Sequence, residues 1–302
     1  MMNLAEYRRT ASRLADYLPW VALVGFGVVL NKDGSFQRTA KFRGPDLDSA
    51  VAAELVAVAG RLNNAFRRLG SGWAIFVEAQ RSEAATYPAS RFPDPASALV
   101  DAERKADFEE KGSHFVSGYF LTFLWLPPAE DAARSESWLY EGRETSSVNP
   151  WELVRGFADR TDRVLALLDG FMPECRWLDD AGTLTYLHST ISINRHRVRV
   201  PETPTYLDAL LADQPLTGGL EPRLGNQHLR VLTITGFPAT TTPGLLDEMN
   251  RLAFPYRWST RAILMDKTDA TRLLTKIRRQ WFAKRKSIAA ILNCLLYTSD
   301  AA

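Results

Sequence analysis

The sequence predicts an α+β protein made of two small sub-domains of hairpin, helix, strand, helix type, followed by a long C-terminal helix. Apolar residues at steps of three and four predict amphipathic helices, and apolar runs between turn residues predict strands. The order hairpin, helix, strand, helix occurs twice along the 302 residues. Hydrophobic residues make up 46% and charged residues 24%, which excludes a wholly disordered, collagenous or coiled-coil chain.

The first predicted sub-domain covers residues 1–171. A Val- and Leu-rich run meets an Asn-Lys-Asp-Gly turn, and the residues after it alternate between apolar and polar, which predicts a β-hairpin. The predicted elements are a helix at 3–18, hairpin strands at 20–30 and 36–42, a helix at 51–69 ended by Gly70, a strand at 72–79, a charged helix at 96–111, a strand at 115–126, a polar loop or domain junction at 129–149, and a helix over 154–171.

The second predicted sub-domain covers residues 172–292. Asp179 or Asp180 is expected to cap a helix that reaches His188, because a carboxylate accepts hydrogen bonds from free N–H groups at a helix start. The further elements are a short helix at 205–212, strands at 215–221 and 228–235, a helix at 245–252, a strand at 256–265 and a final helix at 266–292. The two sub-domains are expected to meet near residues 172–205.

The final helix combines an apolar stripe with a basic surface. Residues 251–302 hold 11 Lys or Arg against 3 Asp or Glu, whereas residues 1–250 hold 26 against 32. Such a basic run contacts nucleic acid or anionic lipid in some proteins, and more often it is a solvated helix face. The stripe is expected to pack on the strand at 256–265. It consists of Leu273, Leu274, Ile277, Trp281, Ile288, Ile291 and Leu292.

The sequence predicts no catalytic, cofactor-binding or metal-binding residue. The phosphate-binding pattern G-x-x-x-x-G-K-[ST] does not occur, and Gly25 and Gly27 are expected to lie inside an apolar strand. His188 and His196 have poor spacing for zinc, and arginines flank His196. The carboxylates of Glu174 and Asp179, close to Cys175 in the sequence, are expected to raise the pKa of its thiol, which argues against a reactive cysteine.

Cysteine content and hydropathy bear on location. Two cysteines far apart in sequence fit a reducing cytosol. The chain opens without a signal-peptide pattern and has no apolar run near the roughly 20 residues that span a bilayer. A cytoplasmic protein that is soluble or peripheral on the membrane is therefore expected.

Several ungapped blocks resemble one known family, the CagE/TrbE/VirB family of type IV secretion ATPases, and within it the N-terminal domain of the TrbE type. The resemblance runs in order over residues 1–292. Its blocks include GVVLNKDGSFQRT at 27–39, ELVAVAGRLNNAFRRLGSGWAIFVEAQR at 54–81, LTYLHSTIS at 184–192 and RQWFAKRKSIAAIL at 279–292.

The resemblance implies a binding and assembly domain of a longer protein. Family members carry a RecA-like ATPase half that uses ATP and Mg²⁺, form hexamers or related oligomers, and drive pilus biogenesis and DNA or protein transfer at the cytoplasmic face of the inner membrane. Their partners are other type IV secretion components. The chain is expected to end before that ATPase half, so no catalytic residue is carried over. Residues 293–302 do not resemble the family and are expected to be non-native read-through.

The sequence therefore leaves two hypotheses about function open. The first is an assembly and partner-binding domain without catalysis of its own. The second is a free-standing nucleic-acid-binding protein that uses the basic helix at 267–286. Its only interleaved aromatics are Trp281 and Phe282, and both fall on the apolar stripe. Strong salt dependence of DNA binding would favour the second.

Overall fold

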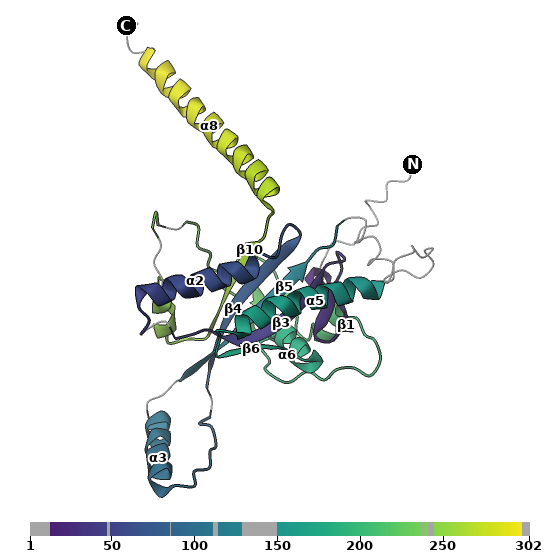
Figure 1. Ribbon diagram of the computed structural model, residues 1–302, viewed down its shortest axis with the longest axis vertical. Coiled ribbons are helices and arrows are strands. Elements are labelled where there is room, and N and C mark those ends of the chain that lie inside the picture. The colour runs from purple at the N-terminus through teal and green to yellow at the C-terminus, as the bar shows by residue number, and fades with distance from the viewer. Residues whose placement is uncertain are drawn as a thin grey trace.

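The computed structural model describes residues 13–46, 49–84, 86–110, 114–128, 150–236, 238–240 and 245–297, with the side chains of the last helix described as far as residue 283. Its centre is a seven-stranded sheet with the order β1-β2-β3-β5-β4-β10, in which β6 also pairs with β3 (Figure 1). Every pairing in this sheet is antiparallel. The strands are β1 Trp20–Gly25, β2 Val28–Asn31, β3 Phe36–Arg43, β4 Trp73–Glu83, β5 Phe115–Trp125, β6 Glu174–Trp177 and β10 Tyr256–Ile263.

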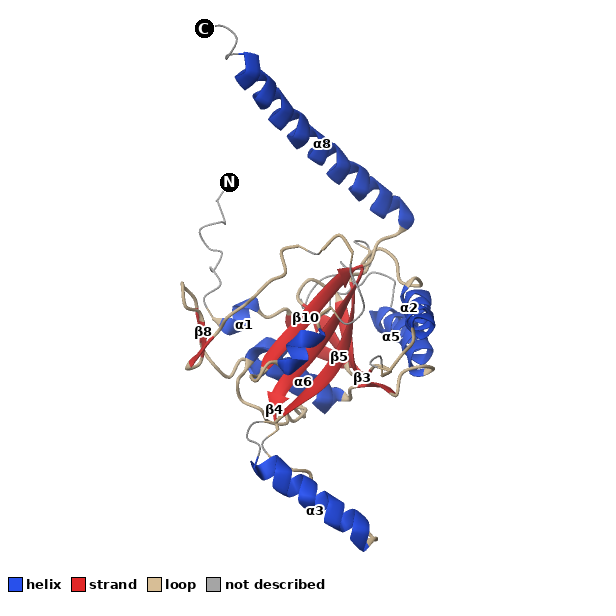
Figure 2. Cartoon of the chain, turned by 90° about the vertical axis from the view of Figure 1, so that its left-hand side faces the viewer, coloured by secondary structure: helices blue, strands red, loops and turns tan. Residues whose placement is uncertain are grey.

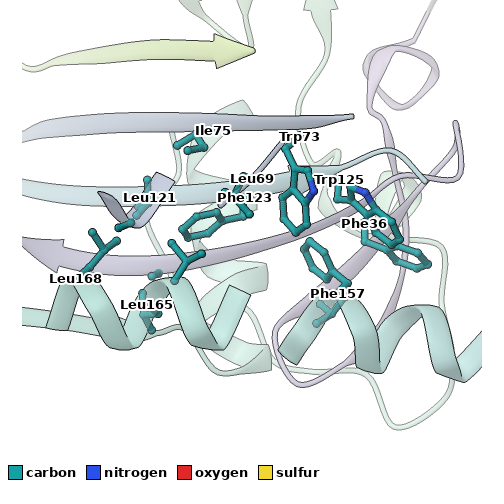
Figure 3. Close-up of a cluster of buried hydrophobic side chains, with 14 of the residues drawn as sticks. Phe36, Leu69, Trp73, Ile75, Leu121, Phe123, Trp125, Phe157, Leu165 and Leu168 are labelled. Atoms are coloured by element: carbon teal, nitrogen blue, oxygen red, sulfur yellow. The ribbon is translucent and has the colours of Figure 1, made fainter. Parts of the chain in front are cut away.

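Helices α2 (Ala52–Phe66) and α5 (Pro150–Asp169) cover one face of the sheet (Figure 2). An aromatic cluster fills the space between α5 and the sheet, where the Phe157 ring lies 5.6 Å from Trp73 and 5.9 Å from Phe36 between ring centroids (Figure 3). Burying large aromatic side chains is among the strongest local contributions to folding. This layer is therefore a main source of stability.

The opposite face carries a second apolar cluster. Val28 and Leu30 belong to the first cluster, and Val29 between them belongs to the second. Because neighbouring side chains on a strand point to opposite faces, the two clusters lie on opposite sides of the sheet. Helices α1 (Leu14–Tyr17), α6 (Asp180–Ile191) and α7 (Leu207–Leu211) supply the covering side chains.

The α+β class and most predicted elements are confirmed. The Asp-Gly hairpin, the two main helices of the first half, the cap at Asp179 and the strand at β10 all form, and the Asp179 carboxylate accepts from the Gly182 amide at 2.6 Å. Of the helix predicted at 3–18, residues 1–12 lie outside the described residues, as does the loop at 129–149. The final helix is α8, Lys267–Tyr297.

The single strand predicted at 20–30 is wrong. It is two strands, β1 and β2, joined by a turn at Phe26 and Gly27. Gly27 has φ +64°, and a Cβ there would come within 2.5 Å of the Leu178 carbonyl oxygen. Its amide also donates to the Asp180 carboxylate at 2.7 Å. Gly27 is thus a tight turn that docks on the start of α6, and both requirements favour glycine.

Two further predictions in the second half are wrong. The strand at 228–235 reduces to β9 (Gln227–His228), which forms a small sheet with β7 (Leu216–Thr217) and β8 (Arg223–Leu224). Among the described residues no strand pairs with 229–236, and Leu232 is 93% exposed. The helix at 245–252 is a short 3₁₀ helix, η3 Asp247–Arg251. A segment with an alternating apolar pattern forms a strand only where a partner strand lies beside it, and a single sequence does not show whether such a partner is present.

The predicted division into 1–171 and 172–292 stays a prediction. Strands from both ranges share the large sheet, because β6 pairs with β3 and β10 pairs with β4 along eight residues. Any boundary near residue 172 would therefore separate strands that are hydrogen-bonded to one another.

Two helices leave the body at opposite ends. Helix α3 (Pro95–Glu110) lies beyond one end of the long strands β4 and β5, and α8 extends from the other end, after β10 (Figures 1 and 2).

Candidate partner-binding surfaces

The start of α8 is attached to the turn between α2 and β4. The Ser71 hydroxyl donates to the Asp269 carboxylate at 2.6 Å, and the Ser71 amide donates to Asp266 at 3.2 Å. Asp269 lies in the first helical turn, where a negative charge is favourable. Gly70 completes the joint, because a Cβ there would come within 2.4 Å of the Asp266 carboxylate. This joint holds the first turn of α8 at the end of the body.

The apolar stripe of α8 faces solvent, so the prediction that it packs on the strand at 256–265 is wrong. Leu274 is 65% exposed, Ile277 49% and Trp281 62%. Helical spacing places these three residues on one face as predicted. After the joint, however, the helix axis points away from the sheet, and β10 lies below the first turn of the helix (Figure 2). The stripe is therefore an exposed apolar surface, a common mark of an interaction site.

The remaining surface of α8 is basic. Residues 267–283 contain five Lys or Arg and one Asp, and all five cations are exposed. Lys276 and Arg278 border the stripe on its two sides, whereas Arg272 and Arg279 lie on the face opposite to it, given 100° per residue. The exposed portion of α8 is thus amphipathic with a positive polar face.

A cavity of about 740 Å³ lies beside α6 and combines aromatic and basic side chains. The rings of His188 and His196 lie 4.5 Å apart, and His188 Nε2 is 3.0 Å from the Asp213 carboxylate. The structure therefore brings together two histidines that lie eight residues apart in the sequence. In the described portion of the chain, no group of three or more His, Cys, Asp or Glu side chains is arranged to hold a metal ion. The cavity is lined by Arg176, Trp177, His188, Arg195, His196 and Arg197, among others.

The prediction for Cys175 is confirmed in direction but not in cause. The residue is 8% exposed, and burial, with Asp169 as a second cause, raises the pKa of its thiol to about 11. The carboxylates named from the sequence, at positions 174 and 179, are not the causes. A thiol that stays protonated is a poor nucleophile, so Cys175 belongs to the core.

Sequence reasoning missed two ionic clusters, each built around one buried charged side chain, Glu78 in the first and Arg38 in the second. Arg257 on β10 is paired with Glu78 on β4, and the Tyr186 hydroxyl donates to the same carboxylate at 3.1 Å. Burial and Glu78 raise the pKa of Tyr186. On the sheet's other half, Asp162 accepts from Arg38 at 2.7 Å and from Trp177 Nε1 at 2.6 Å. The available signal was a charged residue within each apolar strand, because a buried charge needs a partner.

This chain is similar to known proteins of type IV secretion systems. The profile of "Type IV secretion system ATPase VirB4/TrbE, N-terminal domain" matches residues 27–133, which include β2 to β5 and the whole of α3. The conjugal transfer protein TrbE of Rhizobium radiobacter is 33% identical over 301 residues, which is 94% of this chain and 37% of the relative. This chain thus spans about 37% of that relative's length.

Two proteins of Sinorhizobium fredii (strain NBRC 101917 / NGR234), named as the first and the second part of a probable conjugal transfer protein TrbE, extend this result. The first is 39% identical over 130 residues, covering 42% of this chain and 87% of the relative. The second is 36% identical over 101 residues, covering 33% of this chain and 15% of that relative. The chain belongs to the VirB4/TrbE family of type IV secretion system ATPases and matches its N-terminal region.

Proposed function

We propose that this chain is an assembly and partner-binding domain of a type IV secretion ATPase and has no catalysis of its own. The observation that carries the proposal is the exposed stripe of α8, since soluble proteins rarely leave bulky apolar side chains together in water without a binding role. In a longer protein of this family, another domain would hydrolyse ATP and so power pilus biogenesis and transfer. ATP and Mg²⁺ would be bound by that other domain.

The binding role is tested with two matched variants on one helix. Ile277→Asp places a charge in the stripe, and Thr275→Asp places the same charge on the polar face; both positions are exposed. Co-purification with the other components of a conjugal transfer system should be lost for Ile277→Asp and kept for Thr275→Asp. Equal retention by both variants would contradict the proposal.

We further propose that the chain alone neither binds nor hydrolyses ATP. A nucleotide site needs backbone N–H groups and a lysine around the phosphates, and the sequence lacks the loop that supplies them. Calorimetric titration of the purified chain with Mg²⁺–ATP should show no binding. Micromolar affinity would refute this second proposal.

For location, we propose a peripheral position at the cytoplasmic face of the inner membrane, reached through protein partners. Of the helices whose residues are described, none combines the length and apolar character needed to cross a membrane. Resistance to carbonate extraction in cells that lack the partner proteins would count against recruitment by partners.

Nucleic-acid binding by the basic helix at 267–286 is the second candidate function. The exposure of all five cations in residues 267–283 favours it. If the helix binds DNA through phosphates, affinity should fall steeply with salt, by roughly 0.9 log units per log unit of salt for each contact. Arg272→Glu with Arg279→Glu should then abolish binding.

A further inference from the structure

Helix α3 uses one face for contact with its own chain. The Tyr87 hydroxyl donates to the Asp101 carboxylate at 2.7 Å, and the Tyr87 ring lies 5.6 Å from the Phe108 ring. Phe108 also stacks on His114 at 4.0 Å between centroids. The flanking segments thus cover the side of α3 that carries positions 101 and 108.

The other side of α3 faces outward. Leu99, which is 64% exposed, shares this face with the exposed Ala102 and Ala106, since the three lie at steps of three and four. Glu103 and Glu110 border this stripe on one side, Glu109 borders it on the other, and all three are exposed. The outward face is therefore a shallow apolar stripe of mostly small side chains, edged by carboxylates.

The outward face of α3 complements α8 in both shape and charge. Residues 95–110 hold five acids and two bases, whereas residues 267–283 hold five bases and one acid. The stripe of α8 presents bulky side chains, and that of α3 presents small ones, so helices meeting there can pack closely. One border of the α3 stripe carries Glu103 and Glu110, and the other carries Glu109 with its ion-pair partner Lys105, so the net charge at the borders is opposite to that of Lys276 and Arg278.

We propose that α8 of one copy packs on the outward face of α3 in a second copy. The two helices leave opposite ends of the same molecule and point away from each other, so the contact forms between copies (Figures 1 and 2). Such a contact is head-to-tail, and it repeats from copy to copy until a ring closes. The inference rests on the proposed assembly function and names its partner as the chain itself.

The strength of this contact follows from its size. One pair of helices buries less surface than the about 1,200–2,000 Å² of stable complexes. Association is therefore expected to be weak, to increase with protein concentration, and to decrease with salt because charge complementarity supports it.

The experiment is a charge exchange followed by sedimentation over a range of protein concentrations. Lys276→Glu with Arg278→Glu reverses the charges beside the α8 stripe, and Glu103→Arg with Glu110→Arg reverses those beside the α3 stripe. The matched control is Arg272→Glu with Arg279→Glu on the opposite face of α8. All six positions are exposed, and thermal unfolding checks that each variant folds like the wild type.

The wild type and the control should associate, and each reversal should weaken association at least about tenfold, since like charges then face each other. The chain with both reversals should regain association. A monomeric wild type, or a loss with the α8 reversal but not the α3 reversal, would overturn the inference. So would α8-dependent binding to anionic vesicles without self-association. Co-purification with secretion components in the absence of self-association would overturn only the inference and keep the proposed function.

Discussion

Helices α5 and α8 have similar apolar stripes in the sequence and opposite surroundings in the structure. In α5 the stripe is buried, with Phe157 and Leu168 both 0% exposed. In α8, Ile277 and Trp281 are at least 49% exposed. Periodicity thus shows where a stripe lies on a helix, but what covers it depends on where the chain leads the helix. The α5 stripe belongs to this fold, and the α8 stripe is available to a partner.

The largest expected effect is the loss of the aromatic ring at the centre of the α5 layer. Phe157→Ala removes contacts with three rings, including Trp125 at 6.3 Å between centroids. It should lower the free energy of unfolding by about 3–5 kcal/mol, because the buried cavity cannot collapse fully. Urea denaturation followed by tryptophan fluorescence measures this. A loss below about 1 kcal/mol would mean that α5 is no better packed than α8.

A second change tests whether β10 unfolds together with the rest of the sheet or separately, with the exposed helix α8. Arg257→Met leaves the Glu78 carboxylate, whose side chain is 9% exposed, without its cation. An unpaired buried charge should cost about 2 kcal/mol, reduced from fully buried examples because Arg257 is 28% exposed. Thermal unfolding measures the cost. If the substitution leaves thermal unfolding unchanged, β10 lies, together with α8, outside the part of the protein that unfolds cooperatively.

Cys175 reports on the buried layer through pH. Its thiol pKa is about 11 when folded, against 9.0 for the free thiol. Between these values the unfolded chain releases the proton and the folded chain keeps it, so the free energy of unfolding falls as pH rises, by about 1.4 kcal/mol per unit. Denaturant unfolding from pH 8 to 11 should show a shallower fall for Cys175→Ala. Parallel curves for both proteins would contradict the assigned burial.

The smallest expected effect is in α8. From the sequence, with Trp281 assigned to a packed stripe, Trp281→Ala would cost about 3–5 kcal/mol. With Trp281 62% exposed, the same change should alter the free energy of unfolding by less than about 0.5 kcal/mol. Its comparison with Phe157→Ala under identical conditions is the direct test. A cost near that of Phe157→Ala would show that α8 folds back on the body.

The predictions that succeeded depend on local signals. Asp179 caps a helix because its carboxylate reaches the Gly182 amide three residues later, which needs nothing distant in the sequence. The predictions that failed depend on distant partners. Gly27 requires the Leu178 carbonyl and the Asp180 carboxylate, and the segment after β9 required a neighbouring strand. Neither relation leaves a local pattern.

The amino-acid sequence by itself determined the class of fold, most helices and strands, the absence of the phosphate-binding sequence pattern, and the basic and apolar character of residues 267–283. Only the tertiary structure decided that helices cover both faces of one sheet and that Glu78 pairs with Arg257. It also decided that the α8 stripe remains in solvent while the α5 stripe is buried. The physical reason is how far apart along the chain the interacting residues lie. Periodicity, capping and turns depend on residues a few positions apart, whereas burial depends on segments that meet only after folding.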